Sequence, residues 1–165
     1  TPAPSGEVLD NILKAGLRAP DHGTLTPWQF ILFEGEGRER LGALLAEAAR
    51  ARGEDEESIK KCQEAPLRAP LLVAVATRYQ AHPKVPKLEQ ELSAGCALMA
   101  MQMAAQAQGF NGIWRSGWFI FDELINKGLA LAPEDQLVGF LYLGTPMLEA
   151  RKLRELPPGE FVRRF

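Results

Sequence analysis

The spacing of apolar residues along the chain predicts an alternation of helices and strands. The first segment is an amphipathic helix between Ser5 and Pro20, and its apolar face would carry Val8, Leu9, Ile12, Leu13 and Leu17. Ser5 is a favourable N-cap, and the helix should end before Pro20 because the residue ahead of a proline avoids helical backbone angles. The turn-rich loop 21–27 then leads into the mostly apolar run 28–33, which is typical of a strand.

The middle of the chain continues this alternation. Residues 38–52 form a second amphipathic pattern, and Gly53 separates it from a further helix that ends near Ala65. The run Leu71–Ala76 is apolar at every position, which predicts a strand buried on both faces.

The last third of the chain has three shorter signals. Residues 110–117 predict a short strand or extended segment, and Asp122 caps a helix that reaches about Leu129. Residues 137–143 form an apolar strand ended by Gly144. Helices and strands alternate without a regular repeat, so the predicted class is α+β, a layered sheet flanked by helices.

The longest helix runs from Pro86 to Gly109 and is unusual in composition. Its second half, 93–105, is apolar on every side and rich in small residues, which is typical of a helix buried all round. Small side chains also let two helices approach closely. A domain of this size rarely surrounds such a helix, so we expect a second subunit to cover part of it. The tail 157–165 carries the apolar residues Phe161, Val162 and Phe165. It could strengthen the dimer by pairing with the edge of the other subunit's sheet.

Size, charge and cysteine content narrow the class of protein. The 165 residues are expected to form a single domain, 1–165. The net charge of −2 would not attract nucleic acid or acidic lipid. The apolar run 94–101 is too short to span a membrane. With two histidines, two cysteines and no CxxC, we expect no metal site. Cys96 lies in an apolar run and is expected to be a small core residue, and both thiols fit a reducing, cytoplasmic setting.

One candidate site is the loop that follows the first helix. Arg18, Pro20, Asp21 and His22 combine a helix end, a proline stop and a polar loop, which together make a plausible ligand rim. His22 could act as a general acid or as a simple hydrogen-bond donor. The alternative is ordinary helix termination, in which Arg18 stabilises the C-terminal dipole.

A second candidate site is the segment Gly112–Gly117. Trp114, Arg115 and Ser116 stand there between glycines, which let the backbone approach a ligand closely and offer it N–H groups. The alternative is a strand-to-turn joint with a core tryptophan. No GxGxxG motif follows any predicted strand, so a Rossmann-type dinucleotide site is not expected.

Taken together, these segments resemble the FMN-dependent nitroreductase family, and especially its small bacterial NAD(P)H nitroreductases. The similarity is carried by the order and spacing of four motifs over nearly the whole chain. They are Arg18–His22 with Pro27-Trp28, the small-residue helix 93–105 with Gly109, the segment 112–117, and the strand and turn 138–146.

The resemblance implies an intertwined homodimer with swapped tails and two FMN sites at the subunit interface. Trp114, Arg115, Ser116 and Gly117 would line the flavin from one subunit, while Arg18 and His22 would reach it from the other. No side chain would be catalytic in its own right, because FMN itself carries the hydride chemistry. NAD(P)H would give hydride to flavin N5 and leave, and a nitroaromatic or quinone-like acceptor would then take its place in a ping-pong sequence.

The negative charge of reduced flavin would be stabilised by a nearby guanidinium, and both Arg18 and Arg115 are candidates. The family also has an Arg-Arg-Ser-type segment ahead of this region that binds the FMN phosphate, and residues 1–165 contain no match to it. Without it we expect weak FMN affinity, because the phosphate would lose charge-assisted bonds. Basic residues near the C-terminus that could supply some of them are Arg151, Lys152 and Arg154.

Two other functions remain open from the sequence. The first is a dimeric module that binds flavin or another planar ligand without reductase turnover, and the missing phosphate segment favours it. The second is a plain dimerisation domain in which residues 114–117 only form a turn.

Overall fold

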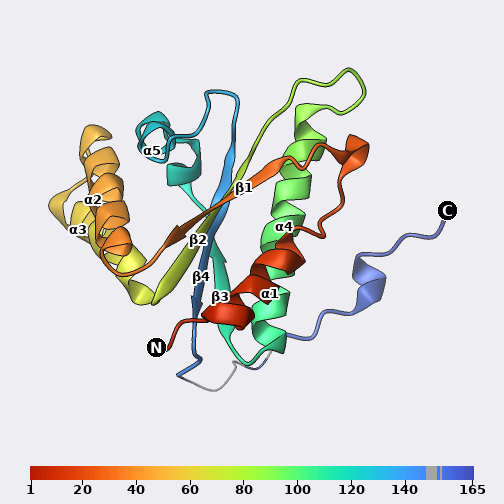
Figure 1. Cartoon of the computed structure of the whole chain (residues 1–165), viewed down its shortest axis with the longest axis horizontal. Coiled ribbons are helices and arrows are strands. Elements are labelled where there is room, and N and C mark those ends of the chain that lie inside the picture. Colours follow the sequence, from red (N-terminus) through yellow and green to blue (C-terminus); the bar gives the residue numbers. More distant parts are fainter. Residues whose placement is uncertain (148–151, 153) are drawn as a thin grey trace.

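The computed structural model describes residues 1–147, 152 and 154–165 and has an antiparallel sheet of four strands in the order β1-β2-β4-β3. The strands are β1 Trp28–Phe33, β2 Leu71–Thr77, β3 Asn111–Arg115 and β4 Leu137–Gly144. Helices pack on both faces of this sheet, as Figure 1 shows. The predicted α+β class with a layered sheet is therefore confirmed.

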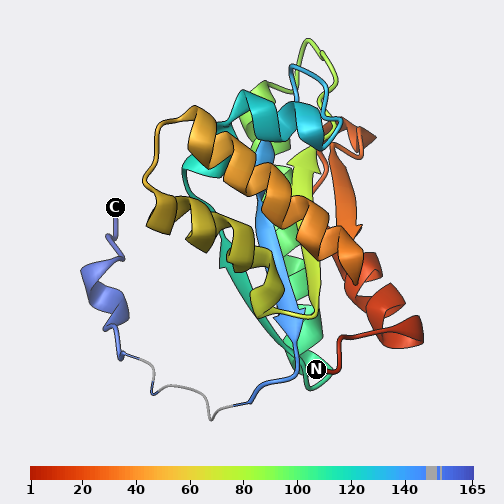
Figure 2. The same cartoon turned by 90° about the vertical axis from the view of Figure 1, so that its left-hand side faces the viewer.

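The helices fall into two groups, one on each face of the sheet (Figures 1 and 2). One face is covered by α1 Gly6–Gly16 and α4 Lys87–Ala107, which also pack against each other. The other face is covered by α2 Glu36–Ala51 and α5 Glu123–Gly128, with α3 Glu56–Glu64 packed on α2. Short 3₁₀ turns lie at His22–Thr24, Ala65–Arg68, Trp118–Phe121 and Pro158–Glu160.

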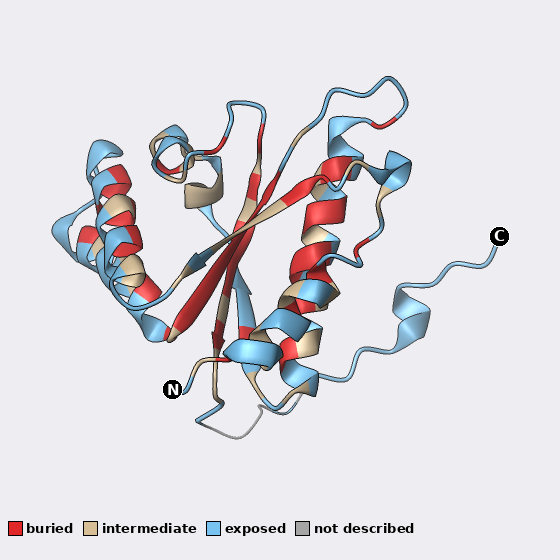
Figure 3. Ribbon diagram, in the orientation of Figure 1, coloured by how far each residue is buried: buried red, intermediate tan, exposed pale blue. Residues whose placement is uncertain are grey.

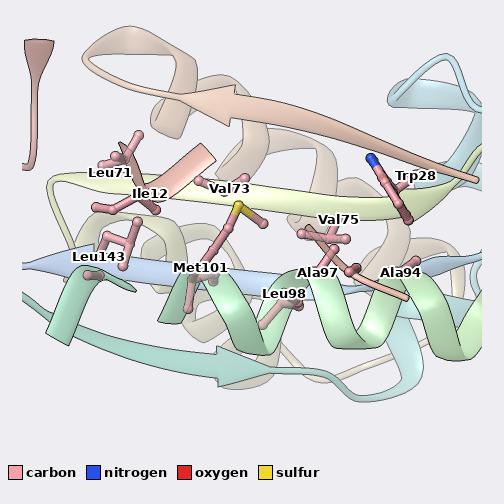
Figure 4. Packing of buried hydrophobic residues seen from close by; sticks show 13 residues of the cluster. Ile12, Trp28, Leu71, Val73, Val75, Ala94, Ala97, Leu98, Met101 and Leu143 are labelled. Atoms are coloured by element: carbon pink, nitrogen blue, oxygen red, sulfur yellow. The ribbon is translucent and has the colours of Figure 1, made fainter. Parts of the chain in front are cut away.

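The central strand β2 separates two hydrophobic cores. Val73 and Val75 pack toward α1 and α4, and Figure 4 shows them facing Ala97, Leu98 and Met101. The alternate residues of the same strand, Leu72, Ala74 and Ala76, pack toward α2 and α5. Every residue of β2 is buried, as the red strand in Figure 3 illustrates. The prediction of a strand buried on both faces is confirmed.

Most predicted boundaries agree with the structure to within a turn. Helix α2 begins at Glu36, two residues before the predicted start. Ser5 occupies the N-cap position of α1 with extended backbone angles, although its side chain makes no capping bond. Asp122 does cap α5, since its carboxylate accepts the N–H groups of Leu124 at 3.0 Å and Ile125 at 3.2 Å.

Within one chain the second half of α4 is buried on one side only, and its cover by a second subunit stays a prediction. Its inner face is buried against the sheet and α1, but Met99 and Met103 on its outer face are exposed. Leu88 and Leu92 in the first half of α4 are exposed as well. Cys96 is also exposed, so its expected place in the core is wrong. A helix that packs on one face of a sheet hides only the side that meets the sheet and the neighbouring helix.

Residues 154–165 at the C-terminus lie away from the sheet in Figure 1. Phe161, Val162 and Phe165 are exposed there, and their pairing with a neighbour's sheet stays a prediction. Arg151 lies outside the described residues, whereas Lys152 and Arg154 are exposed. Over the described part of the chain, no helix combines the length and apolar character needed to cross a membrane.

Candidate functional site

An apolar groove of about 510 Å³ lies between α4 and the 3₁₀ turn Trp118–Phe121, at the end of β3. Its α4 wall is apolar except for Glu91, and its other wall comes from the 3₁₀ turn and the start of β4. The lining residues are Leu88, Glu91, Leu92, Gly95, Cys96, Met99, Trp114, Ile120, Phe121, Gln136, Leu137 and Val138. The described residues that line the groove include no arginine or lysine.

Trp114 enters this groove from β3 because Gly139 makes room for its ring. A Cβ added to Gly139 would lie 2.8 Å from Cδ1 of Trp114 and 2.9 Å from the carbonyl oxygen of Arg115, so any larger residue would collide with both. A Cβ on Gly95 of α4 would lie 3.5 Å from Cη2 of the same ring. Trp114 keeps 39% of its surface exposed, so it is a groove residue and not the core tryptophan of the alternative interpretation.

A β-bulge shapes the same wall. The pairing of β2 with β4 shifts between Val75 and Ala76, where Val75 lies opposite Gly139 and Ala76 lies opposite Leu137. Val138 is the extra residue between them, and its side chain lines the groove. Bulges commonly re-aim a side chain next to a functional site.

The side chain of Gln136 links the 3₁₀ turn Trp118–Phe121 to the start of β4 by hydrogen bonds. Its Nε2 donates to the carbonyl oxygens of Ile120 and Leu137, each at 2.7 Å. Its backbone N–H donates to Oγ1 of Thr77, also at 2.7 Å. No sequence pattern singles out Gln136, because a polar residue just before a strand is ordinary and its partner Ile120 is distant in sequence.

The structure places Trp114 and Arg115 on opposite faces of the sheet, as strand alternation requires. The guanidinium of Arg115 lies 5.5 Å from the ring centroid of Tyr142. Arg115, Tyr142 and Arg68 line a separate cavity of about 810 Å³. Burial raises the pKa of the Tyr142 phenol, and the two arginines partly oppose this shift.

Ser116 and Gly117 connect β3 to the 3₁₀ turn Trp118–Phe121 and are both exposed, and neither lines the groove. The Gly117 carbonyl accepts the N–H of Ile120 at 3.3 Å, which begins the 3₁₀ turn. Gly117 itself has extended backbone angles.

Arg18 and His22 lie on the loop after α1 and are both exposed. Oγ of Ser93 on α4 donates to the Pro20 carbonyl, and the Asp21 carboxylate accepts the N–H groups of Leu25 at 2.9 Å and Thr26 at 2.8 Å. Nδ1 of His22 lies 2.6 Å from Oε2 of Glu89 in the first turn of α4.

The same loop has strained backbone. Thr24 and Thr26 have φ angles of 54° and 47°, which are outliers for β-branched residues. Such conformations cost about 1–3 kcal/mol each and cluster at functional sites. Neither Arg18 nor His22 lines the groove within one chain.

The structure thus does not bring the six predicted site residues together in one chain. Arg18 and His22 lie on the loop after α1, and Trp114 lines the groove. Arg115 lies on the opposite face of the sheet, and Ser116 and Gly117 connect β3 to the 3₁₀ turn.

Comparison with known proteins places this chain in one family. Residues 1–145 match the model of the Nitroreductase family, and the chain belongs to that family. It is therefore an enzyme of the nitroreductase type.

Individual relatives support the assignment. The Escherichia coli K12 protein named "Putative NAD(P)H nitroreductase YdjA" is 52% identical over 165 residues, covering 99% of this chain and 90% of that protein. A Haemophilus influenzae protein named "Putative NAD(P)H nitroreductase" is 37% identical over 163 residues, covering 98% and 89%.

Solved structures show the same fold at lower identity. The nitroreductase-like family protein from Bacillus cereus superposes with a TM-score of 0.84 at 21% identity, covering 99% of this chain and 87% of that one. A Desulfovibrio desulfuricans structure described as a nitroreductase in complex with FMN has a TM-score of 0.73 at 21% identity, covering 98% and 85%.

Proposed function

We propose that the protein is an FMN-dependent oxidoreductase that takes hydride from NAD(P)H and passes it to nitroaromatic or quinone-like acceptors. The observation that carries this proposal is the apolar groove with Trp114 at its base. Family membership and relatives whose names specify NAD(P)H support it, as does the structural neighbour described as a complex with FMN.

The groove fits the ring system of FMN. Ligand pockets usually measure about 300–1,000 Å³ and are mostly apolar, and this groove lies in that range. Its aromatic residues Trp114 and Phe121 suit a planar ring, and its apolar walls would exclude water from one side of it. Bound FMN supplies the acceptance and release of hydride, and the protein binds and orients the ring.

The contacts around the ring would come from both groups of site residues. Trp114 and the backbone of Ser116 and Gly117 would hold the ring from one subunit. Arg18 and His22, which do not line the groove of their own chain, would reach the ring from the other subunit. The Arg115 side chain packs on the opposite face of the sheet, so Arg18 is the better candidate to stabilise negative charge on the reduced ring.

The exposed stripe on α4 supports a homodimer with shared sites. Leu88, Leu92 and Met99 belong both to this stripe and to the groove, so a second subunit that covered the stripe would also close the groove. Exposed apolar surface of this kind commonly marks an interaction site. In the proposed ping-pong order, NAD(P)H would leave before the acceptor takes its place beside the ring.

An absorption spectrum tests the proposal. The protein is incubated with FMN, desalted, and then treated anaerobically with NADH or NADPH before a nitroaromatic or quinone is added. Retained flavin bands that bleach with either nucleotide and recover with the acceptor are the expected result. Retained bands that neither nucleotide bleaches would instead support a flavin-binding module without turnover. Since weak binding is expected, FMN binding is also measured by equilibrium titration before desalting, and a protein that binds no FMN there would contradict the proposal.

A further inference from the structure

The imidazole of His22 has one side-chain partner among the described residues, and that partner comes from a distant part of the chain. Oε2 of Glu89 lies 2.6 Å from Nδ1 of His22, although the two residues are 67 positions apart. Their side chains remain 57% and 45% exposed, so the ring can still meet another molecule.

The backbone beneath His22 is held by other groups. Ser93 bonds the Pro20 carbonyl, and the Asp21 carboxylate accepts two N–H groups further along the loop. On the next residue, a Cβ added to Gly23 would lie only 3.3 Å from Cγ2 of Val85, so the loop also packs closely on the segment before α4. These contacts hold the loop after α1 independently of Glu89. The contact with Glu89 instead orients the imidazole ring of His22.

The contact also selects a tautomer. An ionised carboxylate only accepts hydrogen bonds, so Nδ1 of His22 must carry the proton that it donates to Glu89. In the neutral ring, Nε2 then carries the lone pair and acts as an acceptor. His82 has the opposite arrangement, because its Nδ1 accepts the N–H of Lys84 at 3.2 Å. The two histidines of this chain thus provide an internal comparison.

We propose that Glu89 is a positioning residue of the flavin site. It fixes His22 as the Nδ1–H tautomer and turns Nε2 outward as an acceptor for a hydroxyl or imide N–H of the bound flavin. The flavin part rests on the proposed function, whereas the tautomer is a property of the protein alone. One hydrogen bond between partly exposed side chains contributes little to stability, so a purely structural role for this pair would have small effects.

The first test is the ¹⁵N NMR spectrum of the histidine side chains in flavin-free protein, with His82→Gln to assign the two rings. We expect the Nδ1–H form for His22 in the wild type and a shift toward the Nε2–H form in Glu89→Ala. Glu89→Gln should retain the wild-type pattern, because its carbonyl oxygen can still accept from Nδ1. An Nε2–H form in the wild type, or no change in Glu89→Ala, would overturn the proposal.

The second test is a double-mutant cycle on the dissociation constant for FMN, with His22→Ala, Glu89→Ala and the double variant. Loss of one positioned hydrogen bond should weaken binding roughly three- to tenfold in each single variant. Glu89→Ala should have no further effect once His22 is absent, since coupled residues are non-additive. Additive losses would show that Glu89 acts independently of His22 and would overturn its positioning role.

Glu57→Ala is the matched control, because Glu57 makes an equally short 2.6 Å ion pair with Lys61 on α3, away from the groove. It should leave both the NMR spectrum and FMN affinity unchanged. If the wild type binds no FMN at all, the proposed function fails, while the NMR spectrum still decides whether Glu89 fixes His22.

Discussion

At the scale of single residues, the groove depends on the absence of a side chain at one position. Gly139 on β4 lies directly beneath the Trp114 ring, and its missing Cβ is what allows the ring to lie across the strand. The constraint comes from close approach of a neighbouring side chain and backbone. Glycine is needed at this position because any side chain would displace the Trp114 ring that lines the groove.

Gly139→Ala should therefore displace Trp114 and lower the free energy of unfolding. The added Cβ would collide with the indole and with backbone of Arg115, and overpacking of this kind typically costs about 1–3 kcal/mol. Urea denaturation followed by tryptophan fluorescence measures both effects. Gly159→Ala is the control, since nothing lies within 4 Å of a Cβ there. Equal stability and equal fluorescence for the two variants would contradict the assigned role.

At the scale of elements, the start of α3 gives a pH-dependent contribution to stability. The Asp55 carboxylate caps the helix by accepting the Ser58 N–H at 2.7 Å. This bond holds the pKa of Asp55 below its ordinary value of 3.8. A carboxyl with a lowered pKa in the folded state stabilises the fold above its unfolded-state pKa, and that contribution is lost as the pH falls through the folded-state pKa.

Asp55→Ala should thus be less stable than the wild type near neutral pH, and the difference should shrink below about pH 4. Thermal unfolding across a pH series measures this convergence. Asp55→Asn keeps a good N-cap without a titrating group, so it should stay close to the wild type at neutral pH. A wild-type-to-alanine gap that is constant from pH 7 to pH 3 would exclude the charged cap as its source.

The outer face of α4 is the second feature at this scale. Its exposed apolar residues continue into the groove, so dimerisation and ligand binding would share one surface. Met99 belongs both to the exposed face of α4 and to the groove, so a charged residue at this position tests both features.

Met99→Glu should shift the protein from dimer toward monomer, because a carboxylate buried without a partner at an interface is costly. Light scattering after gel filtration, over a range of protein concentrations, measures the mass. Ala43→Glu introduces the same charge at an exposed site on α2 and should leave the mass unchanged. If both variants keep the wild-type mass, α4 does not form the interface.

At the scale of the whole molecule, ligand binding and folding should be linked. The groove is built from α4, β3, β4 and the intervening 3₁₀ turn, so it exists only in the folded chain. A ligand that binds only this state stabilises it by mass action.

FMN at a hundredfold excess over its dissociation constant should raise the free energy of unfolding by about 2.7 kcal/mol. Riboflavin, which lacks the phosphate, should also stabilise the protein measurably, because the groove is apolar and its described lining has no basic residue. Denaturant titrations with each compound measure the two effects. Stabilisation by FMN with none from riboflavin would mean that phosphate contacts, and not the groove, dominate binding.

The sequence by itself determined the elements and the family motifs. The apolar run Leu71–Ala76 predicted the central strand, and Asp122 predicted the start of α5, because capping and short periodicities depend on neighbouring residues. The order of motifs around residues 18–22 and 112–117 predicted the nitroreductase family, which the family match confirms.

Only the tertiary structure decided which sides of these elements meet. The small-residue composition of α4 is nearly uniform around the helix, so it could not reveal that Cys96 and Met99 face outward. Trp114 and Arg115 are neighbours in sequence, yet the pleat of β3 sends them to opposite faces of the sheet. Glu89 and Gln136 carry no local signal, because each acts on a partner that only folding brings within hydrogen-bond distance.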